Sequence, residues 1–403
     1  MRSRFSLAIL MKHPTQMDGP LFANIQRAGL FDLTVFYLAT ERITSMIDPE
    51  LGYSPDWDIP VAEGYRCVPC PRRFLQRMSF LYHDCLASEK YDLVIIPGYA
   101  RLDTNLLALA PHRQALGMRL DTAPIYPEPR WKSWCKGMVL RRFFHRFAAF
   151  HPVGSLAEQF LKGLKVSPSK IFRYPYAVDN AYLAERARHF VKGREQWLQA
   201  LGIQSKAFVV LGVLKFVPRE NPMELLKGFH LFHESFPDSA LILVGAGPLQ
   251  KAMEAHLTES KLDGAVRLVG YAKYSELPKW YAISNVFVHP AKKESWGVSV
   301  NEAMACGLPV VASSSVGSSY DLVHEGVNGY QYLTGDIKAL ADCLARIASR
   351  ADRGRELGER SRHLINAWDF EATMKSLESA LHMIRSEIAY GAAPGGVTRG
   401  QQN

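Results

Sequence analysis

No apolar run in the sequence is long enough to cross a membrane. The longest runs, such as Ala240–Gly245, are far shorter than the roughly 18–20 residues that a spanning helix requires. Cysteine is scarce as well, with six among 403 residues, and so few cysteines in a chain of this length do not build a disulfide framework. The composition therefore excludes an integral membrane protein and a disulfide-stapled scaffold, and it favours a reducing, cytoplasmic compartment.

Other familiar signatures are also missing. Arg2 and Arg4 precede the apolar run Phe5–Met11, but a Lys-His-Pro sequence follows at once and no small-residue cleavage site appears. This run is therefore predicted to be a first buried strand rather than a signal peptide. The pair Cys67 and Cys70 has no second ligand pair at zinc-site spacing. The chain also lacks helix-turn-helix, RRM-type and zinc-finger signatures, so no nucleic-acid partner is expected.

Positive charge is concentrated in the first half of the chain. The sequence has 48 Lys and Arg against 39 Asp and Glu, and residues 1–200 alone hold 27 basic and 18 acidic residues. A stretch from 130 to 146 contains no acid, and Trp and Phe are interleaved with its basic side chains. Such a helix is typical of a surface that meets an anionic membrane, although a solvated basic helix with aromatic core residues has the same pattern. The basic residues are Arg130, Lys132, Lys136, Arg141, Arg142 and Arg146.

Short apolar, β-branched runs alternate with helix-period segments in two series. In the first series a long helix is expected from about 130 to 150, and the expected strands are Ser6–Met11, Leu33–Leu38, Tyr91–Pro97 and Gly117–Leu120. In the second series the expected strands are Phe208–Leu214, Ala240–Gly245, Val266–Val269, Val286–His289 and Pro309–Ala312. The alternation predicts an α/β protein of two doubly wound domains that face each other, divided near residues 175–205. Ligands of such sheets bind outside the carboxyl ends of the strands, which places the expected site in the interdomain cleft.

Residues 284–313 carry the most informative pattern. A predicted strand ends at His289, a polar loop holds Glu294, and Gly297 permits a tight turn before a helix that begins near Val298. The first N–H groups of a helix and its positive dipole end form a natural cradle for a diphosphate. Glu302 follows Glu294 by eight residues, and a carboxylate at that place can accept hydrogen bonds from a vicinal diol such as a ribose. Two solvated glutamates beside a helix would give the same spacing.

This segment resembles the E-x7-E region of retaining glycosyltransferases of family 4, which adopt the GT-B fold. Four further segments resemble the family in the same order along the chain, namely Leu211–Pro222, Leu243–Leu249, Val269–Leu277 and Val316–Gly329. The likeness is dense over about residues 207–345. It is weaker over Leu7–Gly19 and Lys170–Asn180, which resemble a branch of bacterial polysaccharide-assembly transferases. The resemblance implies a GT-B fold, with two Rossmann-like domains facing across a cleft.

The resemblance also implies roles for residues of the second domain. Glu294 resembles the residue that contacts the hydroxyls of the donor sugar, and Glu302 resembles the residue that binds the nucleotide ribose. Lys215 matches the basic residue that meets the donor diphosphate. A leaving nucleoside diphosphate needs positive charge nearby, which the family usually supplies without a metal. The chain shows no DxD-type acidic cluster, so neither a metal nor another cofactor is expected. The helix start and a loop beside the base complete the implied donor site with Gly297, Val298, Ser299 and Tyr271.

The sequence departs from the family pattern at one position of the donor site. A second basic residue usually follows five positions after the first, but Glu220 stands there, with Arg219 beside it. Either Arg219 substitutes for the missing base or the phosphate clamp is weaker. The departure bears on donor affinity rather than on the fold.

Candidates for the acceptor side follow the strands of the first domain. His13 and Gly19 come after the first strand, where the family usually has glycines near the donor phosphate. A lone histidine there is also often structural. Asp121 follows the strand that ends near Leu120, where it could contact an acceptor hydroxyl or act as a base, or else form a turn beside Thr122.

Together these features predict a retaining hexosyltransferase. It would move a sugar from a UDP- or GDP-linked donor to a glycan or polyprenyl-linked acceptor in polysaccharide or glycolipid assembly. The basic residues Arg130, Lys136, Arg141, Arg142 and Arg146 suggest a peripheral position on the inner face of the cytoplasmic membrane. One alternative is a non-catalytic GT-B protein that binds nucleotide or glycan. Another is a nucleotide-sugar 2-epimerase, which shares the fold but fits the E-x7-E segment poorly.

The predicted domain division follows from the same reading. Residues 1–178 form the acceptor-side Rossmann-like domain, and residues 205–365 form the domain that binds the nucleotide sugar. Residues 179–204 connect the two through a helical linker, and a helix over 366–390 packs back on the first domain. The Gly-rich tail 391–403 is expected to be disordered.

Overall fold

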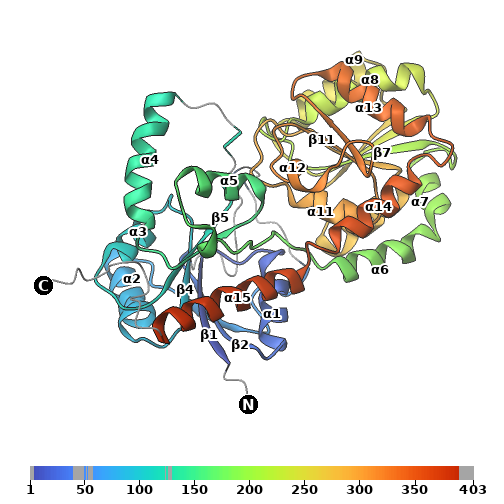
Figure 1. Cartoon of the computed structure of the whole chain (residues 1–403). Coiled ribbons are helices and arrows are strands. Elements are labelled where there is room, and N and C mark those ends of the chain that lie inside the picture. Colours follow the sequence, from blue (N-terminus) through green and yellow to red (C-terminus); the bar gives the residue numbers. More distant parts are fainter. Residues whose placement is uncertain are drawn as a thin grey trace, which may run out of the picture. The chain divides into compact units, whose positions relative to one another are not determined.

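The computed structural model describes residues 4–39, 50, 52, 58–122, 124–125 and 129–389, and the side chain of Arg130 and the tail 391–403 lie outside what it describes. Contacts group the chain into two compact units (Figure 1). Unit 1 contains most of the chain before Ala177 together with a C-terminal helix that begins at Phe370. Unit 2 contains Ala177–Asp369 together with Glu50 and Asp58 from the earlier part of the chain.

Unit 1 is built on a parallel six-stranded sheet with the strand order β3-β2-β1-β4-β5-β6. The strands are β1 (Phe5–Met11), β2 (Phe31–Tyr37), β3 (Arg66–Pro69), β4 (Leu93–Pro97), β5 (Leu116–Leu120) and β6 (Ala149–Pro152). The order reverses between β1 and β4, as in doubly wound sheets. The helices are α1 (Asp18–Arg27), α2 (Phe74–Leu81), α3 (Leu102–Leu109), α4 (Arg130–Phe144), α5 (Ser155–Gly163) and α15 (Phe370–Ala389).

Both faces of this sheet are buried, because successive residues of β1 point to opposite sides and every residue of the strand except Ser6 is apolar and buried. Leu7 and Ile9 pack with α1 and with Leu377 and Leu381 of α15. Ala8 and Leu10 lie in a second cluster with residues of α3, α4 and α5. Helix α15 therefore completes one face of unit 1, although nearly the whole of unit 2 separates it from β1 in the sequence (Figure 1).

Unit 2 repeats the same plan with the strand order β12-β11-β10-β7-β8-β9. The strands are β7 (Phe208–Val213), β8 (Ser239–Val244), β9 (Val266–Gly270), β10 (Val286–His289), β11 (Val310–Ser313) and β12 (Gly329–Tyr332). The order reverses between β7 and β10, which pair directly. The helices are α6 (Asn180–Val191), α7 (Arg194–Ala200), α8 (Pro222–Ser235), α9 (Gln250–Glu259), α10 (Leu277–Ile283), α11 (Val298–Ala305), α12 (Ser319–Leu322), α13 (Ile337–Ala348) and α14 (Arg355–Ile365).

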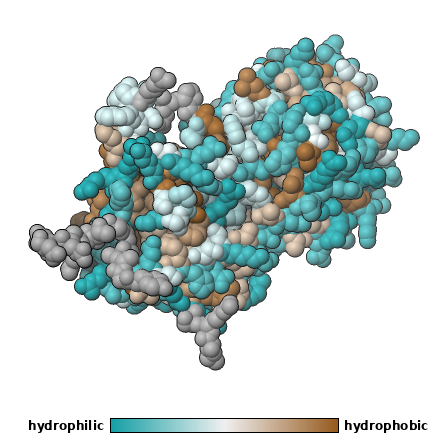
Figure 2. All heavy atoms as spheres, in the orientation of Figure 1, coloured by the Kyte–Doolittle hydropathy of each residue, from teal (hydrophilic) through white to brown (hydrophobic). Residues whose placement is uncertain are grey.

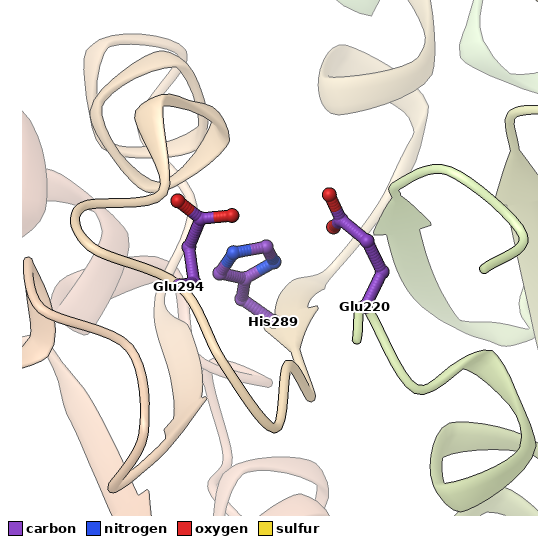
Figure 3. Close-up of side chains that lie close together, drawn as sticks. All are labelled: Glu220, His289 and Glu294. Carbon is purple, nitrogen blue, oxygen red and sulfur yellow. The ribbon is translucent and has the colours of Figure 1, made fainter. Parts of the chain in front are cut away.

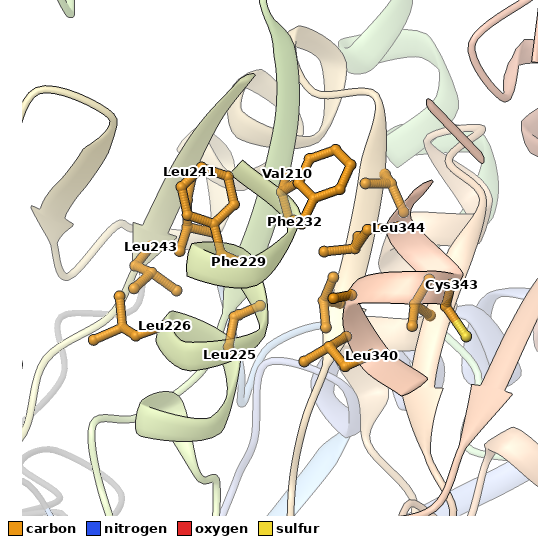
Figure 4. Close-up of a cluster of buried hydrophobic side chains, with 14 of the residues drawn as sticks. Val210, Leu225, Leu226, Phe229, Phe232, Leu241, Leu243, Leu340, Cys343 and Leu344 are labelled. Carbon is orange, nitrogen blue, oxygen red and sulfur yellow. The ribbon is translucent and has the colours of Figure 1, made fainter. Parts of the chain in front are cut away.

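One hydrophobic core of unit 2 lies between one face of its sheet and helices α8 and α13 (Figure 4). Phe229 and Phe232 of α8 meet Val210, Leu241 and Leu243 of the strands, and α13 adds Leu340 and Leu344. Helix α6 packs against α10 and α11, and the ring of Tyr281 on α10 contacts Phe287 of β10. Apolar contacts on both faces hold β7 and β10 side by side, so the loops that follow these two strands begin at fixed positions next to each other.

The predicted fold class is confirmed, and most predicted elements of unit 2 match within one or two residues. The prediction of a helix from about 130 to 150 is wrong at the C-terminal end. Helix α4 ends at Phe144, and the buried run that begins at Phe147 turns back into β6, which pairs with β5. The short strands β3, β6 and β12 were not predicted, because four residues each carry too little pattern to distinguish them from loops.

In the part of the chain that the structure describes, no helix combines the length and the apolar character needed to cross a bilayer.

Candidate functional site

The best-defined group of polar residues in unit 2 lies where its strand order reverses. Lys215 and Arg219 belong to the loop after β7, while Glu294 belongs to the loop after β10 and His289 ends that strand. The crevice at such a reversal point is where doubly wound sheets bind ligands. The fold therefore brings two loops together that are about 70 residues apart in the sequence, as the contact between Arg219 and Glu294 shows directly.

Two basic side chains of this group converge on one carboxylate. Lys215 Nζ lies 2.8 Å from Glu50 Oε2, and Arg219 donates to Glu50 through Nε at 2.6 Å and Nη2 at 2.9 Å. The hydrogen bonds from Arg219 and then those from Lys215 lower the pKa of Glu50 to about 2. A pair of cations that holds a carboxylate in this way has the geometry to hold a phosphate oxygen instead.

Arg219 also contacts the two acidic residues of the site, which Figure 3 shows together with His289. Its Nη1 lies 2.8 Å from Glu294 Oε2 and 3.0 Å from Glu220 Oε1. Glu220 is only 7% exposed, and this burial raises its pKa to about 7 against the lowering effect of Arg219. The residue at the position of the expected second base is thus a buried acid, and Arg219 is the one that reaches both Glu50 and Glu294.

Helix α11 begins directly beside these residues. Gly297 has φ of +91°, and a Cβ atom there would lie 2.8 Å from His289 Nε2, so both the backbone conformation and the space require glycine. The next residues, Val298 and Ser299, start the helix, and the first amides of a helix have no partner within it. The observed start of α11 is the one that the sequence predicted.

Glu302 lies one turn into α11 and is buried. It is 3% exposed, and the hydroxyl of Tyr281 donates to its Oε2 at 2.8 Å. Burial raises the pKa of Glu302 to about 7, and the hydrogen bond from Tyr281 lowers it by less. The ribose contact implied for this carboxylate stays a prediction, as does the base contact of Tyr271, which is exposed directly after β9.

Unit 1 has a polar group of its own at the carboxyl ends of β1 and β5. Asp18 and Arg119 are both buried, and Arg119 Nη1 lies 2.8 Å from Asp18 Oδ1. The guanidinium also lies 4.6 Å from the ring centres of Tyr174 and Tyr176. The hydroxyl of Tyr176 donates to Asp121 Oδ2 at 3.2 Å. Asp121 is exposed, and through Tyr176 it is connected to this buried charged network. Asp18, Arg119, Tyr174 and Tyr176 were not predicted as site residues.

The other two unit 1 candidates have local structural partners. His13 Nδ1 lies 3.0 Å from the carbonyl oxygen of Pro14. Gly19 lies in the first turn of α1, where a Cβ atom would come within 2.6 Å of the carbonyl oxygen of Val61. Close packing against Val61 is therefore a sufficient reason for glycine at this position, and a contact with the donor phosphate stays a prediction.

The basic residues in and just after α4 differ from one another. Arg141 and Arg142 are exposed. Arg146 instead donates to the carbonyl oxygens of Ala108 at 3.1 Å and Ala110 at 2.9 Å, which ties the end of α4 to the end of α3. A cavity of about 1030 Å³ lies beside α4. Its lining mixes apolar and polar side chains, including Tyr99, Leu109, Met138, Val139, Phe143 and Arg142.

Comparisons with known proteins agree with this architecture. Residues 193–364 match the family described as glycosyl transferases group 1. An alpha-monoglucosyldiacylglycerol synthase of Acholeplasma laidlawii is 28% identical over 130 residues, or 32% of either chain. A UDP-Gal:alpha-D-GlcNAc-diphosphoundecaprenol alpha-1,3-galactosyltransferase of Escherichia coli is 28% identical over 190 residues, which cover 46% of this chain and 47% of that one. The chain thus spans a third to a half of the length of these relatives.

Solved structures are similar over nearly the whole chain. HepE of Anabaena in complex with UDP has a TM-score of 0.71 at 16% identity, covering 94% of this chain and 100% of that one. Sucrose-phosphate synthase of Thermosynechococcus elongatus has a TM-score of 0.69 at 18% identity, covering 96% and 100%. At these identities the likeness shows the fold, which is GT-B. The similarity to the glycosyl transferases group 1 covers residues 193–364, which lie within unit 2.

Proposed function

We propose that the protein is a retaining glycosyltransferase that moves a sugar from a nucleoside-diphosphate donor to a glycan or lipid-linked acceptor. The observation that carries this proposal is the convergence of Lys215 and Arg219 on one carboxylate beside the start of α11. Two cations and a helix N-terminus at the reversal point of the sheet form a site for a diphosphate. The related proteins whose names specify a UDP-linked donor or a lipid acceptor support this assignment.

Charge stabilisation of the leaving group is the central step of the proposed mechanism. When the bond between the anomeric carbon and the donor phosphate breaks, negative charge grows on the diphosphate. Lys215 and Arg219 would stabilise that charge, because both are positioned before the reaction begins. In the bound complex the diphosphate replaces the carboxylate of Glu50 on these two side chains, and the amides of Val298 and Ser299 contribute further hydrogen bonds.

Glu294 and Glu302 would hold the other parts of the donor. In the absence of donor, Glu294 accepts from Arg219 through Oε2 and from the backbone N–H of Trp296, at 3.4 Å, through Oε1. A sugar hydroxyl beside the diphosphate would add to these contacts. Glu302 would hold the ribose from within α11. Neither carboxylate is assigned as a nucleophile, since retention is expected to proceed by displacement on the face of the leaving group. On unit 1, Asp121 is the candidate that orients or deprotonates the acceptor hydroxyl.

A membrane-facing surface on α4 would serve a lipid-linked acceptor. Trp131 and Trp134 are 66% and 65% exposed, and Val139 is exposed beside them. The part of the surface over this helix carries pale and brown atoms in Figure 2. Exposed apolar side chains next to Lys136, Arg141 and Arg142 match the interface of an anionic membrane, where each basic residue contributes on the order of 1 kcal/mol. We place the protein at the inner face of the cytoplasmic membrane on this basis.

A thermal-shift panel of UDP, GDP, ADP and their sugar conjugates tests the function first. A ligand that binds only the folded state raises the melting temperature by an amount that grows with the logarithm of its concentration over its Kd. One diphosphate and one conjugate should stabilise the protein, and Lys215→Ala should abolish that shift. A stabilising conjugate that is never consumed with any acceptor would instead identify a non-catalytic binding protein. No stabilisation by any nucleotide would contradict the proposal.

A further inference from the structure

The cavity beside α4 lies between helices α3 and α4 of unit 1, which Figure 1 shows next to each other. Its volume of about 1030 Å³ is at the upper end of the roughly 300–1,000 Å³ that small-molecule sites enclose. Apolar and aromatic side chains from the two helices and from the loop before α3 form most of its lining, namely Tyr99, Leu109, Met138, Val139, Leu140 and Phe143. A cavity of this size and lining has room for a hydrocarbon chain.

The apolar lining continues onto the outer surface of both helices. Leu102, Leu106 and Leu109 of α3 are 68%, 41% and 57% exposed, and their spacing places them on one face of the helix. On α4, Met138 and Val139 are exposed as well. Large apolar side chains that gather on the solvent side of neighbouring helices mark a surface that meets an apolar partner.

The charged side chains at this cavity are all basic. Arg142 and Arg146 line it, and no Asp or Glu does so in the part of the chain that the structure describes. Lys136 lies beside it, with Nζ 5.8 Å from the ring centre of Tyr99. Arg146 is held by two backbone carbonyls, whereas Arg142 is exposed. A basic rim without acids suits a phosphate group next to the apolar chain.

One wall of the cavity is attached to the loop that holds Asp121. The hydroxyl of Thr122, the residue after Asp121, donates to the hydroxyl of Tyr99 at 3.4 Å. The Tyr99 ring stacks on Phe160 with the ring centres 6.0 Å apart, so this wall is held in place. Tyr99 and Asp121 follow β4 and β5, which pair with each other. A ligand whose chain lies in the cavity can therefore present its head group close to Asp121.

We propose that this cavity binds the hydrocarbon chain of a lipid-phosphate acceptor, with the phosphate at the basic rim and the acceptor hydroxyl toward Asp121. The assignment of the chain to an acceptor rests on the proposed function. A soluble glycan has no apolar part to fill the cavity, and a neutral lipid would leave the basic rim without an anionic partner. Each methylene that leaves water for the cavity adds to the affinity, so chain length is the property to test.

Alkyl phosphates test the cavity without nucleotide or membrane. Hexyl, octyl and decyl phosphate, each below its critical micelle concentration, are titrated calorimetrically into the full chain. We expect one site, with an affinity that rises about fivefold or more for each added pair of methylenes. Leu109→Trp, which fills the cavity from α3, should lower the affinity for decyl phosphate about tenfold, and Met138→Gln, which makes the α4 wall polar, about threefold. Leu75→Trp is the matched control and should bind as the wild type does, because Leu75 is exposed on α2 outside the cavity.

Two further comparisons identify the head group and the source of the chain. Arg142→Gln should weaken binding of decyl phosphate about threefold and leave binding of the neutral decyl glucoside unchanged. Leu109→Trp should bind vesicles of phosphatidylcholine and phosphatidylglycerol as the wild type does, because the cavity holds the acceptor and does not anchor the protein. If vesicle binding fell together with decyl phosphate binding, the chain would belong to a bilayer phospholipid and the acceptor assignment would be wrong.

The outcomes separate this inference from the proposed function. If decyl phosphate does not bind saturably up to about 1 mM, or if Leu109→Trp and Met138→Gln bind it as the wild type does, the chain site is wrong even where UDP or GDP binds. Circular dichroism of the two variants checks that they are folded. If the alkyl phosphates bind as expected and no nucleotide binds, the cavity stands as a lipid-phosphate site and the proposed function fails. Sugar transfer to decyl-linked glycosyl phosphates with a KM about tenfold below that of their methyl-linked counterparts would support both, and equal KM values would contradict the acceptor assignment.

Discussion

Arg219 holds the carboxylate of Glu50 through two hydrogen bonds, at 2.6 and 2.9 Å, in the forked geometry that guanidinium groups use for phosphates. Lys215 binds the same carboxylate. In the proposed function these cations bind the donor diphosphate, so Glu50 is an internal anion that the donor must displace. Donor affinity is then the difference between two similar interactions rather than the full strength of one.

Replacing Glu50 by Gln should raise the affinity for the preferred nucleoside diphosphate about three- to tenfold. The amide keeps the shape but loses the charge, so the diphosphate displaces a weaker competitor. Isothermal titration of wild type and variant measures the change, and Glu325→Gln serves as the control for loss of a surface acid that pairs with an arginine. Weaker binding in Glu50→Gln would mean that Glu50 helps to position Lys215 and Arg219 rather than competing with the ligand.

Replacing Glu294 by Ala should abolish sugar transfer and leave nucleotide binding largely intact. Glu294 accepts hydrogen bonds from Arg219 and from the backbone N–H of Trp296, and it is expected to hold the sugar, not the nucleotide. Freed of that acid, Arg219 keeps Glu50 or the diphosphate as its partner. Single-turnover transfer and Kd for the diphosphate are measured side by side. A loss of diphosphate affinity as large as the loss of transfer would remove Glu294 from the sugar subsite.

The strongest predictions from the sequence concern features that depend on local pattern. The apolar runs of β7 and β10 and the start of α11 at Val298 are each encoded within a few residues. Gly297 could be singled out because the turn needs positive φ there. Two series of alternating elements were enough to predict two doubly wound sheets, because a parallel sheet buried on both faces requires continuous apolar strands.

Other features depend on contacts between distant residues and have no local signal. Glu50 meets Arg219 across 169 positions in the sequence. His289 was predicted only as the end of a strand, and its buried, unpaired nitrogens follow from packing against Gly297. Arg146 belonged to a uniform basic stretch in the sequence, yet it binds two backbone carbonyls. Composition cannot distinguish a structural arginine from a solvated one.

The buried carboxyl of Glu302 should make stability depend on pH. Its pKa is about 7 in the folded protein, raised from an ordinary value of 4.5 by burial. Above pH 7 the group is charged in both states, and burying the charge opposes folding. As the pH falls from 7 to 4.5 the folded state binds a proton that the unfolded state does not, so the contribution of this group to stability rises as the pH falls. Below 4.5 the group is protonated in both states.

Glu302→Gln should therefore be more stable than the wild type at pH 8, by on the order of 3 kcal/mol. The advantage should shrink toward zero at pH 4.5, and Gln can still accept the hydrogen bond from Tyr281. Urea unfolding of both proteins from pH 4.5 to 8 gives the difference directly. Comparing the two cancels the other titrating groups, including Glu220 and the buried His151 and His289, whose pKa values are also shifted. A difference independent of pH would show that Glu302 stays charged in the folded protein.

The arginines in and just after α4 should separate membrane binding from folding. Arg141 and Arg142 are exposed, so their double replacement by Ser should lower binding to anionic vesicles at low salt by on the order of tenfold, with little change in the melting temperature. Arg146→Ala should instead lower the melting temperature and leave vesicle binding little changed. It removes two charge-assisted hydrogen bonds to the carbonyls of Ala108 and Ala110, each worth about 1–3 kcal/mol. Vesicle sedimentation and thermal unfolding of both variants make the comparison. If the double variant bound anionic vesicles as tightly as the wild type, α4 would not be the membrane-facing surface, and its exposed Trp131 and Trp134 would need a different partner.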